Sequence, residues 1–329
     1  MDTQRSAPSP QSAFRPLNRA YGAVFQPGRL SVGLVVPIEA YPHTRVPTLE
    51  RHLERVKLAE ELGFAAVWLR DVPFDVPTFG DAGQVFDPFV YLGALAATTE
   101  RIALGVASVI LPLRQPAHVA KAAASADVLS GGRVLLGIAS GDRPEEYPAL
   151  HASFPERGAR FRESVALLRA LAEHSPRFAN ESGTLTGGMD LLPKPVGGRL
   201  PLLITGGSQQ SPEWVARHGD GWMTYPRDVA LQRRVVADYR RRVAAAGIAN
   251  KPVMQSLYID LVEDPDAPPR PIHLGFRSGI RFLRQHLAGL RLAGVNHVAL
   301  NLRFQSTPVE KALERLATEL LPALAQDRP

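Results

Sequence analysis

The sequence has no cysteine among its 329 residues. This absence excludes disulfides, thiolate nucleophiles and cysteine-bound zinc or iron–sulfur sites. No apolar run approaches the roughly 18 residues that a membrane span needs, and the first residues lack the apolar core of a secretory signal. We therefore expect a cytoplasmic protein with no membrane partner.

Lysine is also scarce. Only five of the 38 basic residues are lysine, so arginine supplies the other 33, and the net charge is +6. The densest arginine clusters lie between residues 233 and 242 on a helical pattern, without interleaved aromatic residues. Because nucleic-acid surfaces combine basic and aromatic side chains, we expect no nucleic-acid partner; a basic surface of this kind attracts small anions.

Short apolar runs alternate with helical patterns from residue 29 onward. Strands are predicted over 29–36, 65–69, 102–106, 134–138, 202–204, 221–224, 253–262 and 297–302, and helices over 49–62, around 91–95, and over 117–129, 158–173, 212–218, 228–246, 276–292 and 309–324. Strands without polar alternation are typical of a parallel sheet covered by helices. Eight such units predict one α/β domain over 29–329, a (β/α)8 TIM barrel. An open doubly wound sheet is the alternative.

Two segments fall outside this alternation. Residues 1–28 are rich in proline, serine, glutamine and arginine, and we interpret them as an irregular N-terminal arm. Residues 175–198 form a glycine- and proline-rich excursion between the fourth helix and the fifth strand, too long for an ordinary loop. We expect this excursion to form a ribbon beside the mouth of the active site.

Barrel enzymes carry their chemistry at the carboxyl ends of the strands. No lysine lies at a predicted strand end, so a Schiff-base aldolase is disfavoured. The nine histidines are scattered, so no metal site is predicted. The chain also lacks a GxxxxGK[ST] phosphate loop and a GxSxG elbow.

The clearest positive signal is the segment 205–214, TGGSQQSPEW, which follows the fifth strand. Gly206 and Gly207 allow close approach of a ligand to the backbone, and the Ser208 and Ser211 hydroxyls can donate to a phosphate. A plain helix cap, with Ser211 at the N-cap and Pro212 following, is the alternative. The small residues at 105–108 suit a flat aromatic ligand, although ordinary barrel packing explains that pattern equally.

These segments follow one another in an order that resembles the bacterial luciferase-like monooxygenases. The segments that carry the resemblance are 68–71 (WLRD), 105–112 (GVASVILP), 116–121 (PAHVAK), 127–133 (DVLSGGR), 136–141 (LGIASG) and 206–208 (GGS) with 213–216 (EWVA). The resemblance extends from about residue 29 to the C-terminal helix. It implies a TIM barrel that binds FMN, or a related reduced flavin, at the carboxyl ends of its strands.

The resemblance also assigns residues to the cofactor site. The turn of Gly206, Gly207, Ser208 and Ser211 matches the family's phosphate-binding turn. The loop of Ser140, Gly141 and Arg143 matches the segment after the fourth strand, which approaches the phosphate. Ala107–Ser108 matches a non-prolyl cis peptide that contacts the flavin ring.

The sequence departs from the family pattern at two places. An acidic residue and then paired histidines follow the second strand in many relatives; here Asp71 is present and 72–74 are Val, Pro and Phe. An arginine that contacts phosphate is replaced by Ser140, for which Arg143 is a substitute. We expect Asp71 to be the catalytic polar group, with Arg70, His43, Tyr225 and Arg227 as lesser candidates.

The resulting hypothesis is a flavin-dependent monooxygenase that uses reduced FMN and dioxygen on a small organic substrate. Because GxGxxG is absent, a separate flavin reductase would supply the reduced cofactor. Apolar walls such as Val109, Ile110 and Leu111 would exclude water from the reacting cofactor. A homodimer is expected from the resemblance, and the alanine-rich face of 117–126 permits close helix packing.

Three other functions stay open at this point. They are a deazaflavin-dependent oxidoreductase, a flavin-binding protein without turnover, and a lyase or isomerase of sugar phosphates with Asp142 or Glu145 as its base.

Overall fold

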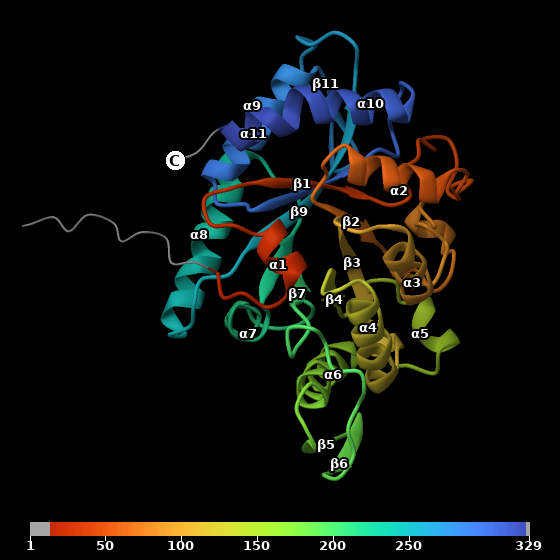
Figure 1. Ribbon diagram of the computed structural model, residues 1–329, viewed down its shortest axis with the longest axis vertical. Coiled ribbons are helices and arrows are strands. Elements are labelled where there is room, and N and C mark those ends of the chain that lie inside the picture. Colours follow the sequence, from red (N-terminus) through yellow and green to blue (C-terminus); the bar gives the residue numbers. More distant parts are fainter. Residues whose placement is uncertain (1–13, 327–329) are drawn as a thin grey trace, which may run out of the picture.

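The computed structural model describes residues 14–326, and their eight parallel strands close into a barrel (Figure 1). The barrel strands are β1 (Ser31–Val35), β2 (Ala66–Leu69), β3 (Ala103–Ile110), β4 (Val134–Ala139), β7 (Leu202–Thr205), β8 (Gly221–Thr224), β9 (Val253–Leu261) and β12 (His297–Asn301). They are hydrogen-bonded in that order, and β12 pairs with both β9 and β1. The predicted TIM barrel is thus confirmed, and the open sheet is not formed.

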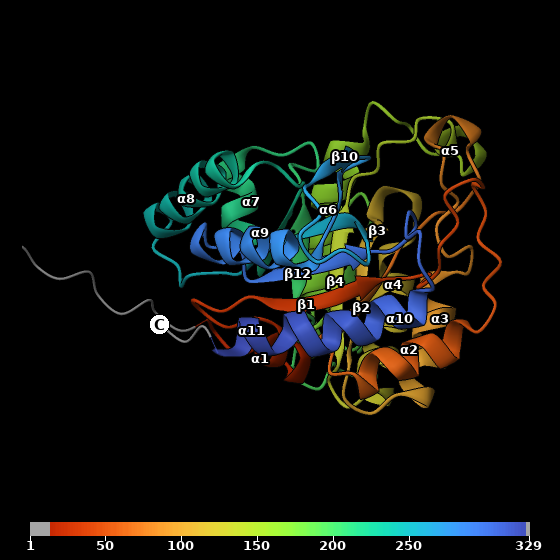
Figure 2. The ribbon, with the colours of Figure 1, turned by 90° about the horizontal axis from the view of Figure 1, so that it is seen from above.

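Helices surround the strands in both views (Figure 1 and Figure 2). They are α2 (His52–Glu61), α3 (Pro88–Thr98), α4 (Pro116–Leu129), α6 (Arg157–Leu171), α7 (Pro212–His218), α8 (Val229–Ala245), α9 (Ile280–Leu292), α10 (Val309–Arg315) and α11 (Leu321–Gln326), the last two joined by a π-helical turn, Leu316–Leu320. Short helices Pro77–Phe79 (η1), Leu111–Leu113 (η2) and α5 (Glu146–Ala149) lie in loops. None of the helices between residues 14 and 326 is long and apolar enough to cross a membrane.

The strands separate two apolar cores because successive side chains point to opposite faces. One face packs against the helices and includes Leu34, Leu104 and Leu136. The other fills the barrel and includes Trp68 and Leu135, neither of which is exposed. This division leaves only the two ends of the barrel open to polar chemistry.

Residues 14–28 close the amino-terminal end of the barrel. They form helix α1 (Arg19–Val24), and Phe14, Tyr21 and Phe25 join the interior core. The Ser31 hydroxyl donates to the Val24 carbonyl at 2.7 Å and lies 2.7 Å from His297 Nδ1. The expected irregular arm therefore does not hold for residues 14–28, whereas 1–13 lie outside the described residues.

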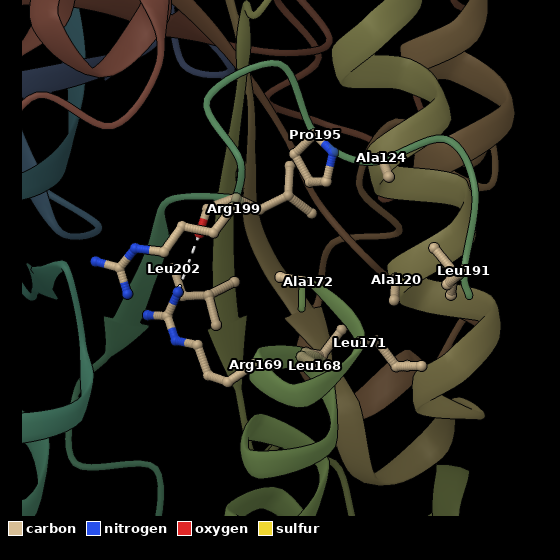
Figure 3. Close-up of a pocket in the computed structure, with 11 residues that line it drawn as sticks. Ala120, Ala124, Leu168, Arg169, Leu171, Ala172, Leu191, Pro195, Arg199 and Leu202 are labelled. Atoms are coloured by element: carbon tan, nitrogen blue, oxygen red, sulfur yellow. Dashed lines mark hydrogen bonds between the residues drawn. The ribbon is translucent and has the colours of Figure 1, made fainter. Parts of the chain in front are cut away.

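The excursion forms an antiparallel ribbon, β5 (Arg177–Asn180) and β6 (Gly183–Thr186), as expected. None of residues 175–198 lines the large cavity at the barrel mouth, but the turn of the ribbon, Glu181 and Ser182, lies beside residues 112–116, which follow β3. Farther along the excursion, Leu191 and Pro195 lie beside Ala120 and Ala124 of α4 and the apolar side of α6 (Figure 3). The space left there is about 20 Å³, roughly one water molecule.

This packing also affects the expected dimer face. Ala120, Ala123, Ala124 and Ala126 are each at most 5% exposed within the single chain. These four alanines of α4 are therefore covered by the chain itself, whereas Ala117 and Ala122 of the same segment are partly exposed, and the homodimer stays a prediction.

A second unforeseen element follows β9. Strands β10 (Arg270–Ile272) and β11 (Gly275–Ser278) form an antiparallel pair, and β11 runs parallel to the end of β9. The pair begins where the irregular connection of 263–271 ends, and β11 takes the place of the first residues of the helix predicted over 276–292, so that helix begins only at Ile280.

Candidate functional site

A cavity of about 420 Å³ opens at the carboxyl ends of the barrel strands. This volume lies in the usual range of cofactor and substrate pockets. Nine of the ten predicted site residues line it: Asp71, Ala107, Ser108, Ser140, Gly141, Arg143, Gly206, Gly207 and Ser208. The predicted residues thus gather around one cavity, and their binding of a cofactor stays a prediction; the contacts give several of them different roles from those expected.

The glycine turn after β7 presents backbone amides to the cavity. Gly206, Ser208 and Gln209 all have positive φ, at +55°, +44° and +60°. Between residues 14 and 326 the amides of Gly207, Ser208 and Gln209 find no acceptor. Successive left-handed residues with free N–H groups form an anion-binding nest, so this turn is suited to a phosphate.

The two predicted serines of this turn differ in their contacts. The Ser208 hydroxyl donates to the Thr205 carbonyl at 2.8 Å and fixes the turn. The Ser211 hydroxyl accepts the Trp214 amide at 3.2 Å as the N-cap of α7. Ser211 is exposed and does not line the cavity, so the structure gives it the capping role that was the alternative.

The predicted cis peptide between Ala107 and Ser108 is present. The register of β3 against β4 shifts between Val106 and Val109. Both Ala107 and Ser108 consequently face the cavity, and the Ser108 hydroxyl is hydrogen-bonded to that of Thr205.

The same shift corrects the expected apolar wall. Val109 and Leu111 belong to the outer core between strands and helices, and only Ile110 of the three lines the cavity. An unbroken alternation of side chains would have directed Val109 inward. The cavity lining also includes charged and polar side chains, namely Arg70, Asp142, Arg143, Glu146 and Asn301.

Asp71 lines the cavity, and both oxygens of its carboxylate accept hydrogen bonds from other residues of the chain. Arg114 donates to both oxygens, from Nε at 2.8 Å and from a terminal nitrogen at 2.7 Å, and the Ile110 amide donates at 3.1 Å. The side chain of Asp71 is 1% exposed. These contacts tie the end of β2 to the end of β3.

The loop after β4 is held closely against the cavity. Gly141 has φ +77°, and a Cβ there would lie 2.7 Å from Ile110 Cγ2 and 2.8 Å from the Tyr147 hydroxyl. That hydroxyl donates to the Ser140 carbonyl. Only glycine fits this position, which brings the Arg143 side chain to the cavity, with its guanidinium 4.8 Å from the Phe79 ring.

Arg70 also lines the cavity and belongs to a charged cluster that the sequence did not reveal. It donates to Asp81 Oδ2 at 2.7 Å and to the Tyr41 hydroxyl at 3.2 Å, and Arg303 lies 3.3 Å from the same Asp81 oxygen. Burial alone would raise the pKa of Asp81, but the two guanidinium groups hold it below its usual value. Two cations share one carboxylate, so this side of the cavity carries a surplus positive charge.

The remaining lesser candidates are dispersed. His43 is exposed and does not line the cavity. Tyr225 lines it at the glycine turn, and burial raises the pKa of its hydroxyl. Gln255 on β9 and Asn301 on β12 line the cavity but were not predicted; polar residues within otherwise apolar strands were the available signal.

A second cavity, of about 540 Å³, adjoins the glycine turn between α7 and α8. It shares Gly206, Gly207, Thr224 and Tyr225 with the first cavity, and three arginines line it: Arg227, Arg234 and Arg242. Arg242 is paired with Glu213 and Asp238. Arg227 bonds only neutral oxygens, and Arg234 has no hydrogen bond or ion pair within the described part of the chain.

Comparison with known proteins identifies the family. A model of the luciferase-like monooxygenases matches residues 29–281. The chain belongs to this family. Its members are flavin- or F420-dependent oxidoreductases or monooxygenases, so the protein is an enzyme of redox chemistry. Across residues 14–326, no group of histidine and acidic side chains could hold a metal ion.

Relatives within the luciferase-like family include mycobacterial proteins. Rv0953c of Mycobacterium tuberculosis is 32% identical over 234 residues, 67% of this chain and 82% of its own length. An F420-dependent hydroxymycolic acid dehydrogenase of the same organism is 28% identical over 232 residues, 68% of this chain and 60% of its own.

Solved structures share the fold. The monooxygenase RslO1 of Streptomyces bottropensis superposes with a TM-score of 0.74 at 22% identity, covering 89% of this chain and 99% of its own. An F420-dependent secondary alcohol dehydrogenase superposes with a TM-score of 0.73 at 19% identity, covering 90% and 99%.

Proposed function

We propose that this luciferase-like protein is an F420-dependent oxidoreductase that transfers hydride between the cofactor and a small alcohol or carbonyl compound. The observation that carries the proposal is the arginine-lined cavity adjoining the glycine turn. FMN ends at its phosphate, whereas F420, a deazaflavin, continues beyond its phosphate into an anionic tail. A basic cleft that continues from a phosphate-binding turn suits the longer molecule.

The residues of the first cavity fit such a cofactor. The free amides of Gly207, Ser208 and Gln209 would hold its phosphate. Ala107 and Ser108 would support its ring, above the apolar side chains of Met223 and Met254. The bound cofactor supplies hydride acceptance or donation, and the chain orients the substrate against it.

The polar lining supports hydride transfer to or from an oxygen-bearing carbon. Arg70 and Asn301 offer donors to a substrate oxygen, and the surplus charge around Asp81 favours a partly negative oxygen. Asp71 is proposed as a positioning residue, because its carboxylate is committed to Arg114 and Ile110.

A second candidate function is monooxygenation with reduced FMN, dioxygen and a separate flavin reductase. The match to the luciferase-like monooxygenase model and the superposition on RslO1 favour it. Monooxygenation requires a reaction chamber that excludes water, and the charged side chains in the lining of the first cavity do not favour this.

The relative affinities for F420 and FMN distinguish the two proposed functions. The purified protein is titrated with F420, with the same deazaflavin lacking phosphate and tail, and with FMN, following fluorescence. We expect F420 to bind at least tenfold more tightly than the other two. Preferential binding of FMN, with oxygen uptake in the presence of a reductase and NADH, would instead establish the monooxygenase.

A pair of neighbouring arginines provides the control. Arg234→Ala should weaken F420 binding about threefold, as expected for one exposed charge, and leave the tail-less deazaflavin unaffected. Arg233→Ala removes an exposed charge from the same helix outside the cavity and should change neither affinity. If the two variants changed F420 affinity equally, the proposal that the second cavity binds the anionic tail would be contradicted.

A further inference from the structure

Glu146, at the start of α5, is a buried carboxyl group that faces the cavity. Its side chain is 3% exposed, and it lines the 420 Å³ cavity. The backbone of Phe74 lies close enough to oppose the rise in the pKa of this carboxyl, and Oε1 is buried without a hydrogen-bond partner between residues 14 and 326. A buried oxygen left unsatisfied by the protein is costly unless a ligand completes it.

The charges around Glu146 leave it poorly compensated. The nearest cation is Arg143, whose terminal nitrogen lies 3.7 Å from Oε1; this distance is too long for a hydrogen bond, and the nitrogen has no other hydrogen-bond partner within the described residues. Asp142 on the same loop and Asp71 at the end of β2 add negative charge near Glu146. The charge of Glu146 in turn contributes to the raised pKa of the neighbouring Tyr147 hydroxyl. Burial raises the pKa of Glu146, and Arg143 only partly opposes this effect.

The other carboxylates at the cavity are unsuited to proton exchange with a buried substrate. Both oxygens of Asp71 accept hydrogen bonds from Arg114. Asp142 is exposed to solvent. Glu146 alone among the three combines burial with a free acceptor oxygen.

We propose that Glu146 is the acid–base residue that exchanges a proton with the substrate oxygen; this inference rests on the function proposed above. In the oxidative direction, its carboxylate takes the hydroxyl proton while the carbon-bound hydrogen leaves with its electron pair to the oxidised deazaflavin. The substrate C–O bond becomes C=O, the cofactor gains two electrons, and Glu146 becomes neutral. Reduction of a carbonyl reverses each transfer.

The first test measures the carboxyl group itself. Protein enriched with ¹³C at glutamate Cδ is titrated by NMR as wild type, Glu146→Gln and Glu145→Gln. Glu145 is the matched control, because it is the exposed preceding residue and does not line the cavity. The resonance lost only in Glu146→Gln should titrate above the usual glutamate range and shift when F420 is added.

The outcomes separate the two proposals. Failure of F420 to bind the wild-type protein refutes the proposed function. Binding of F420 without any change in the Glu146 resonance overturns the role of Glu146 and leaves the proposed function intact.

The second test measures turnover with an alcohol or ketone that the wild type converts. General acid–base catalysis contributes about 10²–10⁴-fold, so Glu146→Gln should lower kcat at least 100-fold with little change in KM, and should abolish one limb of the pH profile. Glu145→Gln should stay within twofold. Glu146→Asp, which keeps an acid one methylene further away, should retain partial turnover. An unaltered pH profile in Glu146→Gln would overturn the assignment.

Discussion

Asp71 offers the most direct test of how the cavity is held together. Its carboxylate is 1% exposed and accepts three hydrogen bonds, two from Arg114 and one from the Ile110 amide. Asp71→Ala would leave that amide unsatisfied and remove half of a bidentate ion pair. Breaking a buried pair from one side costs about 3–5 kcal/mol.

Two features of Arg114 reduce this cost. The side chain is 25% exposed, and it keeps a second carboxylate, Asp87, at 2.8 Å. We therefore expect Asp71→Ala to lower the free energy of unfolding by about 2–3 kcal/mol. At roughly 2 °C per kcal/mol for a chain of this size, the Tm should fall by about 5 °C. Cofactor affinity should fall too, because Ile110 lines the cavity.

The same loop contains a matched control. Asp75 pairs with Arg45 at 2.8 Å, but the two side chains are 39% and 38% exposed. An exposed pair contributes about 0–1 kcal/mol, so Asp75→Ala should leave the Tm within about 2 °C of the wild type. The assay is thermal unfolding followed by circular dichroism. Equal Tm values for the two variants would refute the view that Asp71 braces β2 against β3.

Two further predictions concern the phosphate turn and the barrel interior. Ser208→Asp places a negative charge among the free amides of the turn, so F420 affinity should fall at least tenfold by fluorescence titration, whereas Ser211→Asp, on the exposed helix cap, should preserve it. Burial lowers the pKa of His297 from 6.5 to about 3. As the pH falls below 6.5, this histidine therefore becomes protonated in the unfolded chain before it does in the folded protein, and the free energy of unfolding decreases. Between pH 6.5 and 5 this loss is about 2 kcal/mol; urea unfolding of His297→Gln should show a correspondingly weaker decline, and an identical decline would contradict it.

The sequence was most informative where local pattern determines structure. Alternating strands and helices indicated the barrel, and two glycines before a serine cap indicated the turn at Gly206 and Gly207. Residues at strand ends were placed correctly because parallel strands direct those ends to one face.

Tertiary contacts were beyond the reach of pattern. Nothing in the local sequence shows that the carboxylate of Asp71 is hydrogen-bonded to Arg114, 43 residues further along the chain. Glu146 lies in a polar loop, and nothing local shows that its side chain is buried at the cavity. The register shift after Val106 reversed the direction of Val109.

The helix that closes the amino-terminal end of the barrel has a signal in the sequence. Leu17, Tyr21 and Val24 recur at helical spacing, and Asn18 accepts the Tyr21 amide as an N-cap. Surrounding proline and arginine masked this pattern. The helix is only six residues long, and such a helix depends on tertiary packing for its stability.

The packing of α1 against the barrel interior makes the molecule a cup with a filled base. Because Tyr21 and Phe25 fill that base, ligands must both enter and leave the barrel at its carboxyl-terminal end. A cofactor bound across the rim, as proposed above, would therefore lie on the route of the substrate. Under that proposal we expect an ordered exchange, in which the substrate binds after the cofactor and leaves before it.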